Sequence, residues 1–465
     1  MQARLPLMIQ DSSTSKNFEG LPNLGLEGFN PKNEEFFLSG PISKQIAVLD
    51  FDPETGKLVQ GAKWHKPPPK RKRGWYENNE EDEEKKRRFD EYKKLNLEDL
   101  TTPTFLQINT FATVLKTIYM LRESEKEEDK DKGDTLGRSI KWASGLPQLL
   151  VIPRAGRMKN AFYHRETNSL QFFMFSPTDK PDQTVYTCLF RDIVAHETGH
   201  AIVDAIAPDL YHAQQSQALA MHESIADLTA LLMAISSWNL NRIVLEKTHG
   251  IIRESNDFST IAENWRTELK EGGRHMRDLL NHKTLDSIES DECHELSEVL
   301  SGALYNVFLK IYEDFKGALE THYAKDPTKR KKLWFHVSHS ALYDYAAERF
   351  KQMIFRALDY LPPGDVSFAD YGRALVAADS VGYYGEERTQ KIRNWIKNEF
   401  LERKIIKDED ALDVNTFFKD DALNDFDVSN LYKSDWEAYR FANSPEGRKL
   451  LCIPLKSPLK CSPLD

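Results

Sequence analysis

The chain has 465 residues, and its 63 basic and 73 acidic side chains give a formal net charge of −10. This acidic balance argues against a general nucleic-acid binder. No stretch of the sequence approaches the roughly 20 apolar residues that a membrane-spanning helix needs. The length allows two or three domains, each with its own hydrophobic core.

The opening segment and the cysteines together predict a cytoplasmic protein. The opening, MQARLPLMIQDSSTSKNFEG, contains no apolar run long enough for the core of a secretion signal. The cysteines Cys188, Cys293, Cys452 and Cys461 show no paired spacing, which favours free thiols in a reducing compartment over disulfides or a structural zinc site.

Residues 1–95 are predicted to form an extension, because their sequence is rich in turns and only weakly periodic. Within them, KPPPKRKRGWYENNEEDEEKKRRFDEYKK places a basic block next to acidic ones. A nuclear-import signal is one interpretation of this stretch. A solvated linker or an exposed helix is the favoured one.

Residues 96–206 are predicted to form a lobe of mixed helix and strand. Thr102 and Pro103 resemble the N-cap and first position of a helix. The segment LPQLLVIP predicts a short buried strand, and NAFYHRETNSLQFFMF predicts strand, turn and strand.

The rest of the chain is predicted to be mainly helical. Residues 207–400 are expected to form a helical lobe, with the lysine- and aromatic-rich segment 312–345 as an insertion between two helices. Residues 401–465 are expected to form an acidic tail. The predicted fold class is α+β, with a functional cleft between a mixed N-terminal half and a helical C-terminal half.

The mixed lobe ends in a segment with evenly spaced ionisable residues, DIVAHETGHAIVD. Asp192, His196, His200 and Asp204 recur every four residues, which places them on one face of a helix. With Glu197 they contain the H-E-x-x-H pattern, in which two imidazoles hold zinc and the glutamate acts as general base. The alternative is a polar helix face without a metal.

A second apolar helix, MHESIADLTALLMAI, also carries carboxylates. Glu223 comes twenty-three residues after His200, and Asp227 follows at the next turn. Like charges four residues apart repel, so a buried pair requires a cation or hydrogen-bond donors nearby. Glu223 as third zinc ligand, and Asp227 as acceptor for the outer nitrogen of His196 or His200, would satisfy both carboxylates.

At these residues the chain resembles the thermolysin-like zinc metallopeptidases of the gluzincin group. DIVAHETGHAIVD is similar to that family's active-site helix, and ESIAD is similar to its E-x-x-x-D third-ligand helix. Downstream, HELSEVLSGALYNVF resembles the segment with the second catalytic histidine, and IFRALDYLPPGDVSFADYGRALVAA resembles the helical end. The resemblance covers roughly residues 100 to 400 in the family's order.

The resemblance implies roles for residues outside the two helices. Tyr211 and His294 would stabilise the oxyanion that forms during peptide hydrolysis. Asn160 and Ala161 would bind the substrate backbone along an edge strand. Arg277 would be the substrate-binding arginine, with Arg274 and Arg266 as close rivals.

Some positions depart from the family's pattern or leave a choice open. Ala234 stands where the family has an acidic calcium ligand, although Asp192 matches another member of that site, so calcium is expected to add little stability. The acidic partner of His294 could be Glu289 or Asp291. Cys293 could approach the zinc, although a small packed side chain is the favoured interpretation.

Together these residues predict a zinc-dependent endopeptidase with one Zn²⁺ per chain, acting on peptides or unfolded protein in an extended conformation. Two alternatives stay open: an inactive zinc-containing protein that only binds peptides, and an aminopeptidase of a related gluzincin type. The sequence has no G-x-M-E-N-like segment of the kind those aminopeptidases use for the free amine. A purely structural zinc domain is disfavoured, because the predicted ligand set leaves one position open.

Overall fold

The computed structural model describes residues 3–8, 24–29, 38, 40–63, 99–122, 140–178, 180–213, 215–254, 256, 258–259, 278–324, 334–362, 364–382, 387–413 and 435–450. The chain forms two compact units, residues 1–409 and 410–465. The second unit contains α15 (Asp435–Asn443) and α16 (Pro445–Leu450). The candidate site lies in the first unit.

The main sheet has four short strands in the order β3-β4-β6-β5. They are β3 (Ile46–Val48), β4 (Leu149–Ile152), β6 (Ser169–Phe172) and β5 (Ala161–His164). The β3-β4 and β4-β6 pairs are parallel and the β5-β6 pair is antiparallel, so β5 is an edge strand. The predicted buried strand and the predicted strand, turn and strand are both confirmed.

The described residues also form two smaller antiparallel sheets. One pairs β1 (Ala3–Met8) with β2 (Leu24–Phe29), and the other pairs β7 (Met174–Phe175) with β8 (Val185–Tyr186). The strand β3 comes from the region predicted as an extension, so part of that region contributes to the main sheet.

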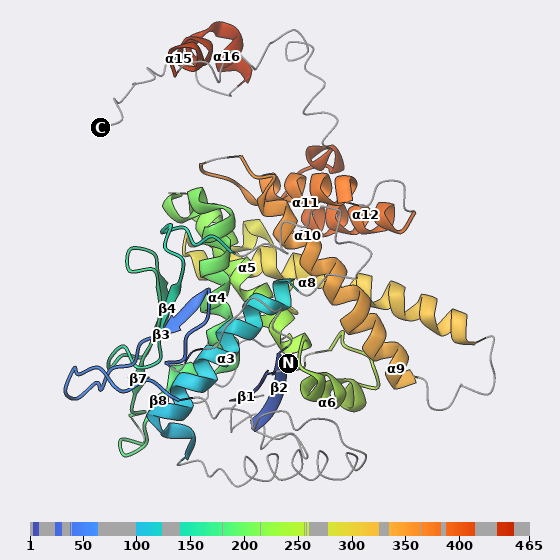
Figure 1. Ribbon diagram of the computed structural model, residues 1–465. Coiled ribbons are helices and arrows are strands. Elements are labelled where there is room, and N and C mark those ends of the chain that lie inside the picture. The colour runs from blue at the N-terminus through green and yellow to red at the C-terminus, as the bar shows by residue number, and fades with distance from the viewer. Residues whose placement is uncertain are drawn as a thin grey trace, which may run out of the picture. The chain divides into compact units, whose positions relative to one another are not determined.

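The helix α3 (Pro103–Arg122) begins as its sequence predicts, since Thr102 Oγ1 accepts the backbone N–H of Phe105 at 3.2 Å. It packs against β1, β3 and α4 (Figure 1). A buried polar contact fixes it to the sheet: Gln107 donates to Asp50 at 2.9 Å, and Arg154 donates to both oxygens of the same carboxylate at 2.9 Å.

After Tyr186, the regular elements formed by the described residues are all helices. The α-helices are α4 (Arg191–Ile206), α5 (Ser216–Ile235), α6 (Trp238–Thr248), α8 (Cys293–Tyr323), α9 (Trp334–His339), α10 (Glu348–Leu358), α11 (Phe368–Gly382) and α12 (Glu387–Glu402). A π-helical segment, η7 (Ser340–Ala347), joins α9 to α10. Short 3-10 helices are η1 (Asp99–Thr101), η3 (Thr187–Leu189), η4 (Pro208–His212), η5 (Leu285–Ser287) and η8 (Glu409–Leu412).

The prediction of an insertion at 312–345 is wrong in its described parts. Helix α8 continues without a break to Tyr323, and residues 334–345 belong to α9 and η7. Lysines of this part of α8 have specific partners: Lys316, within the segment, donates to the Gly250 carbonyl at 3.1 Å, and Lys310, just before it, pairs with Glu399 of α12 at 2.7 Å.

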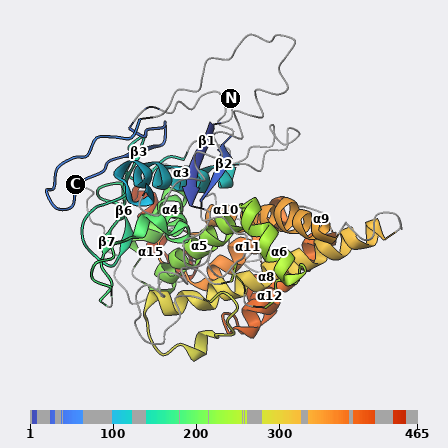
Figure 2. The ribbon, with the colours of Figure 1, turned by 90° about the horizontal axis from the view of Figure 1, so that it is seen from below.

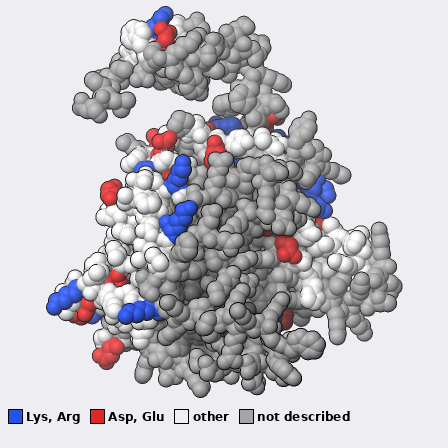
Figure 3. Space-filling model, viewed as in Figure 1, with Lys and Arg blue, Asp and Glu red and all other residues white. Residues whose placement is uncertain are grey.

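Helix α5 forms the centre of the helical part, between α4 and α8 (Figure 2). By length and composition alone it could cross a membrane, but 83% of its apolar window is buried inside the unit. Its apolar character is therefore that of a core helix. On the face shown in Figure 3, the acidic and basic side chains of described residues are interspersed.

The first unit thus combines small sheets with a larger helical part, the mixed class that the sequence predicts. A specifically thermolysin-like arrangement stays a prediction.

Candidate metal centre

The candidate site depends on the close approach of α4 and α5, and Gly199 permits that approach. A Cβ atom at Gly199 would lie 2.9 Å from the Ala226 Cα atom and 3.0 Å from Thr229 Oγ1. Contacts this short are not tolerated, so only glycine fits where the two helices cross. The glycine of the H-E-T-G-H sequence therefore brings the carboxylates of α5 near the histidines of α4.

Three side chains from the two helices converge with their donor atoms. The Nε2 atoms of His196 and His200 lie 3.0 Å apart. The Glu223 carboxylate lies 3.5 Å from the first of these atoms and 3.4 Å from the second. Ligands held at about 2.0–2.1 Å by a tetrahedral zinc ion are separated by roughly 3.3 Å. The three predicted ligands are thus spaced to bind one such ion.

Burial strengthens the case for a cation at this position. The side chains of His196, His200 and Glu223 are only 9%, 13% and 15% exposed. A carboxylate taken out of water in this way requires a positive partner, because its desolvation costs several kcal/mol. A divalent cation between the three donors would supply that charge.

Asp227 orients the first histidine. Its Oδ1 atom lies 2.9 Å from Nδ1 of His196, and its side chain is 1% exposed. A carboxylate at this position accepts the Nδ1 proton and leaves the Nε2 lone pair for a metal. The sequence left the choice between His196 and His200 open, and the structure places Asp227 at His196.

His222, which the sequence analysis did not single out, contacts the second histidine. Its Nδ1 atom lies 2.7 Å from Nδ1 of His200, and the two rings stack with centroids 4.8 Å apart. If His200 binds a metal through Nε2, its Nδ1 carries the proton, so Nδ1 of His222 must accept it. Burial lowers the pKa of His222 to about 4, which keeps this acceptor neutral.

Glu197, the predicted general base, is fixed to the edge strand β5. Its Oε2 atom accepts the backbone N–H of Tyr163 at 2.9 Å, and the residue is 8% exposed. Because residues along a strand alternate in direction, the backbone groups of Ala161 and Tyr163 share this outer edge of β5. The edge next to Glu197 is therefore the one that carries Asn160 and Ala161.

The Asn160 side chain caps the first residue of this strand. Its side-chain oxygen accepts the N–H of Ala161 at 2.9 Å. This leaves the side-chain amide of Asn160 and the carbonyl of Ala161 as the groups predicted to meet a substrate backbone.

A buried network joins α4 to the end of β5. Tyr163 donates its hydroxyl to Asp204 at 2.7 Å, and Arg165 pairs with the same carboxylate at 3.2 Å. Both donors meet the Oδ2 atom of Asp204, so this carboxylate contacts β5 and its continuation, although the sequence places it on the same helix face as the two histidines. The network fixes the strand whose N–H contacts Glu197.

Tyr211 lies in η4, beside this network. The Arg165 guanidinium lies 5.0 Å from the centre of the Tyr211 ring, and the rings of Tyr163 and His222 lie 6.1 and 6.4 Å away. Burial raises the pKa of Tyr211, and a hydrogen bond from the Arg165 backbone opposes that rise. The structure therefore places the predicted oxyanion donor next to His222.

His294 approaches the three donors from α8. Its Nε2 atom lies 3.6 Å from the Glu223 carboxylate, and its Nδ1 atom pairs with Glu292, the N-cap of α8. With 53% of its side chain exposed, it lies at the solvent side of the site. Glu292 is therefore an acidic partner of His294 in the structure, in place of the two residues that the sequence offered.

The remaining predicted residues divide into two groups. Arg277, with its rivals Arg274 and Arg266, lies outside the described residues. Next to Ala234, the buried Arg191 guanidinium donates to the Met233 carbonyl. The expectation that calcium adds little stability stays a prediction.

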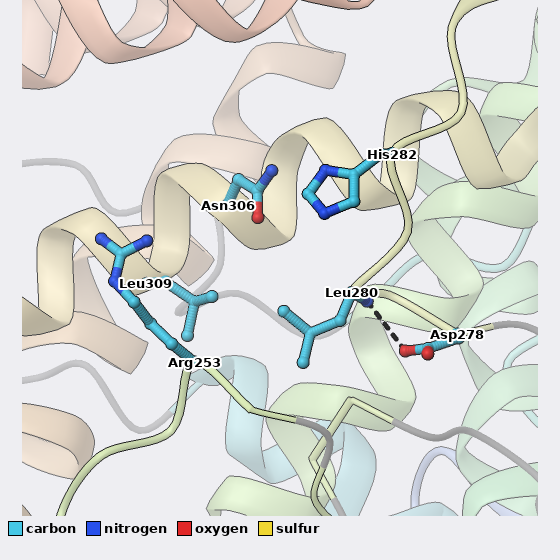
Figure 4. A pocket seen from close by; sticks show the side chains of 6 residues that line it. All are labelled: Arg253, Asp278, Leu280, His282, Asn306 and Leu309. Carbon is cyan, nitrogen blue, oxygen red and sulfur yellow. Dashed lines mark hydrogen bonds between the residues drawn. The ribbon is translucent and has the colours of Figure 1, made fainter.

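A separate cavity of about 340 Å³ lies at the middle of α8 (Figure 4). Its lining residues are Arg253, Asp278, Leu280, His282, Asn306 and Leu309. The structure assigns His282 to this cavity, and among the described residues the groups of donors spaced for a metal do not include it.

Neither models of known protein families nor curated protein sequences gave a match to this chain.

We predict that Asp227→Ala lowers zinc affinity by about 10- to 100-fold, because His196 loses the carboxylate that fixes its tautomer and ring orientation. The measurement is competition for zinc against a chelator of known affinity, with Asp209→Ala, which removes an exposed carboxylate of η4, as the matched control. Equal zinc retention by both variants would show that Asp227 has no orienting role.

We also predict that His222→Phe weakens zinc binding by roughly tenfold or more. Phenylalanine keeps a buried ring against His200 but removes the nitrogen that accepts its Nδ1 proton. The same substitution at His282, which lines the separate cavity, is the control. Circular dichroism would verify the fold of each variant, and an unchanged zinc affinity of His222→Phe would contradict the tautomer assignment.

Proposed function

We propose that the protein is a zinc-dependent endopeptidase. The observation that carries this proposal is the convergence of His196, His200 and Glu223, with the Glu197 carboxylate, from the residue that follows His196, hydrogen-bonded to an edge strand. Two imidazoles and one carboxylate form the ligand set of catalytic zinc sites, which keep one position open.

Zinc in such a site supplies two chemical effects, a pKa near 7 for its bound water and polarisation of a carbonyl group. The protein's part is to hold the metal and to move protons. Glu197 takes the proton of the attacking water on its carboxylate and delivers it to the leaving amine. Its hydrogen bond from the Tyr163 backbone N–H holds the carboxylate next to β5, where the substrate would bind.

His294 is the side chain best placed to stabilise the oxyanion. Its Nδ1 atom pairs with Glu292, and its Nε2 atom lies 3.6 Å from the Glu223 carboxylate, on the side of the metal-binding group. Tyr211 is the second donor, and its hydroxyl would have to turn from the Arg165 backbone towards the substrate. We therefore assign the larger share of oxyanion stabilisation to His294.

The edge strand β5 gives the substrate class. An extended peptide would pair with its outer edge through the Ala161 carbonyl and the Asn160 side chain. Only chain segments without secondary structure can add to an edge in this way. The proposed substrates are therefore peptides and unfolded protein, and a cytoplasmic location remains the prediction from the sequence.

The test of this proposal is cleavage of an unfolded protein, such as reduced casein, by purified protein. Activity should disappear after metal removal and return with one equivalent of Zn²⁺ per chain. We predict that Glu197→Gln abolishes cleavage while zinc content stays near one per chain, because glutamine keeps the shape but cannot accept the water proton. Undiminished cleavage by this variant would exclude the mechanism.

The outcome for the parent protein separates the proposal from an inactive peptide-binding relative. If the parent and Glu197→Gln both bind zinc and peptide but neither cleaves, the result would favour that alternative. Release of single residues from the N-terminus, without internal cuts, would favour an aminopeptidase.

We further predict that His294→Ala lowers kcat by about 100-fold or more, with KM changed by no more than a few-fold. The hydrogen bond to the oxyanion strengthens only as the carbonyl becomes tetrahedral, so its loss appears in kcat. Zinc content should be unchanged, and His282→Ala serves as the control. Loss of zinc instead would mean that His294 is a metal ligand.

A further inference from the structure

A second group of potential metal ligands overlaps the first one. Glu223, Cys293 and His294 also place one donor atom each within 4.8 Å of one another. The Cys293 sulfur lies 3.7 Å from Nδ1 of His294 and 3.7 Å from a Glu292 oxygen. Glu223 belongs to both groups, so a thiol stands next to the metal ligands on the side that would be open to water.

The spacing brings this thiol within reach of a metal held by the first group. In a tetrahedral site with a zinc–sulfur distance of about 2.3 Å and a zinc–oxygen distance of about 2.0 Å, the sulfur and oxygen ligands are roughly 3.5 Å apart. The Cys293 sulfur is already within 4.8 Å of the Glu223 carboxylate. Cys293 is grouped with Glu223 and His294 and not with the two other histidines, so ligation requires its side chain to turn from His294 towards His196 and His200.

The fold holds Cys293 at this place. It is the first residue of α8, and a hydrogen bond between two buried serines joins that end of the helix to α5. Ser224 donates to the Ser297 carbonyl at 2.9 Å, and Ser297 donates to the His294 carbonyl at 2.8 Å. The distance between Cys293 and Glu223 is therefore set by two packed helices.

We propose that Cys293 is a reversible fourth ligand of the metal held by His196, His200 and Glu223, and that it closes the site in a resting form. This inference builds on the proposed function. When the sulfur–metal bond forms, the bond from the metal to water breaks, and the thiol proton passes to solvent. The step involves no change of oxidation state. A closed site with four protein ligands has no water to activate, so the resting form is inactive.

Cobalt(II) provides a readout that does not depend on peptide cleavage. The full chain would be stripped of metal and titrated with Co²⁺ as the parent, as Cys293→Ser and as Cys188→Ala, which removes a fully buried thiol elsewhere in the fold. A sulfur-to-cobalt charge-transfer band in the near ultraviolet should appear with the first equivalent in the parent and in Cys188→Ala. Cys293→Ser should bind one equivalent without that band.

A second measurement follows the thiol itself. Alkylation of Cys293, mapped by mass spectrometry, should be roughly tenfold or more slower in the zinc-loaded protein than in the metal-free protein, since a metal-bound sulfur is a poor nucleophile. Cys188 should be unreactive in both states because it is buried. The peptidase activity of Cys293→Ser should exceed that of the parent.

Two results would overturn the inference: identical cobalt spectra for the parent and Cys293→Ser, or a charge-transfer band that appears only with a second equivalent of Co²⁺. The second result would assign Cys293 to an independent metal site. A Cys293-dependent band with the first equivalent, together with no peptide cleavage by zinc-loaded Cys293→Ser, would refute the proposed function while the sulfur ligation stands.

Discussion

The contact between α4 and α5 is the constraint on which the site depends. At Gly199 the two helices lie so close that a single methyl group would collide with the backbone of α5. This approach places the imidazoles of one helix within 3.5 Å of the carboxylate of the other. Buried polar groups at such a contact must satisfy one another, and nearly every further feature of the site is a consequence of that requirement.

Each histidine of α4 meets a different acceptor. His196 has the carboxylate of Asp227, whereas His200 has the neutral ring of His222. A carboxylate raises the basicity of a ligating imidazole more than a neutral ring does, so the two ligands are electronically unequal. Asp204, one turn after His200, pairs with Tyr163 and Arg165 and thereby links the helix to β5. The same strand donates to Glu197, so the candidate metal ligands, the proposed base and the proposed substrate edge share one connected framework.

The parts of the site that follow helical periodicity could be predicted from the sequence. The histidines of H-E-x-x-H share a face because 3.6 residues complete one turn, and Glu223 and Asp227 share a face for the same reason. Contacts between distant segments could not be predicted in this way. The His222 contact depends on the rotation of α5 relative to α4, and the Glu197 contact joins residues 34 positions apart.

In the fold, too, local features could be predicted from the sequence, whereas contacts between distant segments could not. Local signals located α3 and the strands β4, β5 and β6, because caps, turns and apolar runs act over a few residues. The interpretation of 312–345 as an insertion failed because α8 continues to Tyr323, and Lys316 of that segment finds its partner, the Gly250 carbonyl, 66 residues earlier in the chain. Similarly, the choice of Glu292 as partner of His294 follows from its position as N-cap of α8, which spacing alone does not reveal.

The central claim is that α4 and α5 together hold one metal ion. Anomalous diffraction at the zinc absorption edge, from crystals of the purified protein supplied with one equivalent of Zn²⁺, tests it most directly. The account predicts one strong peak, bonded to Nε2 of His196, Nε2 of His200 and the Glu223 carboxylate at about 2.0–2.2 Å. A zinc peak bound by other residues, or none between these three side chains, would contradict it.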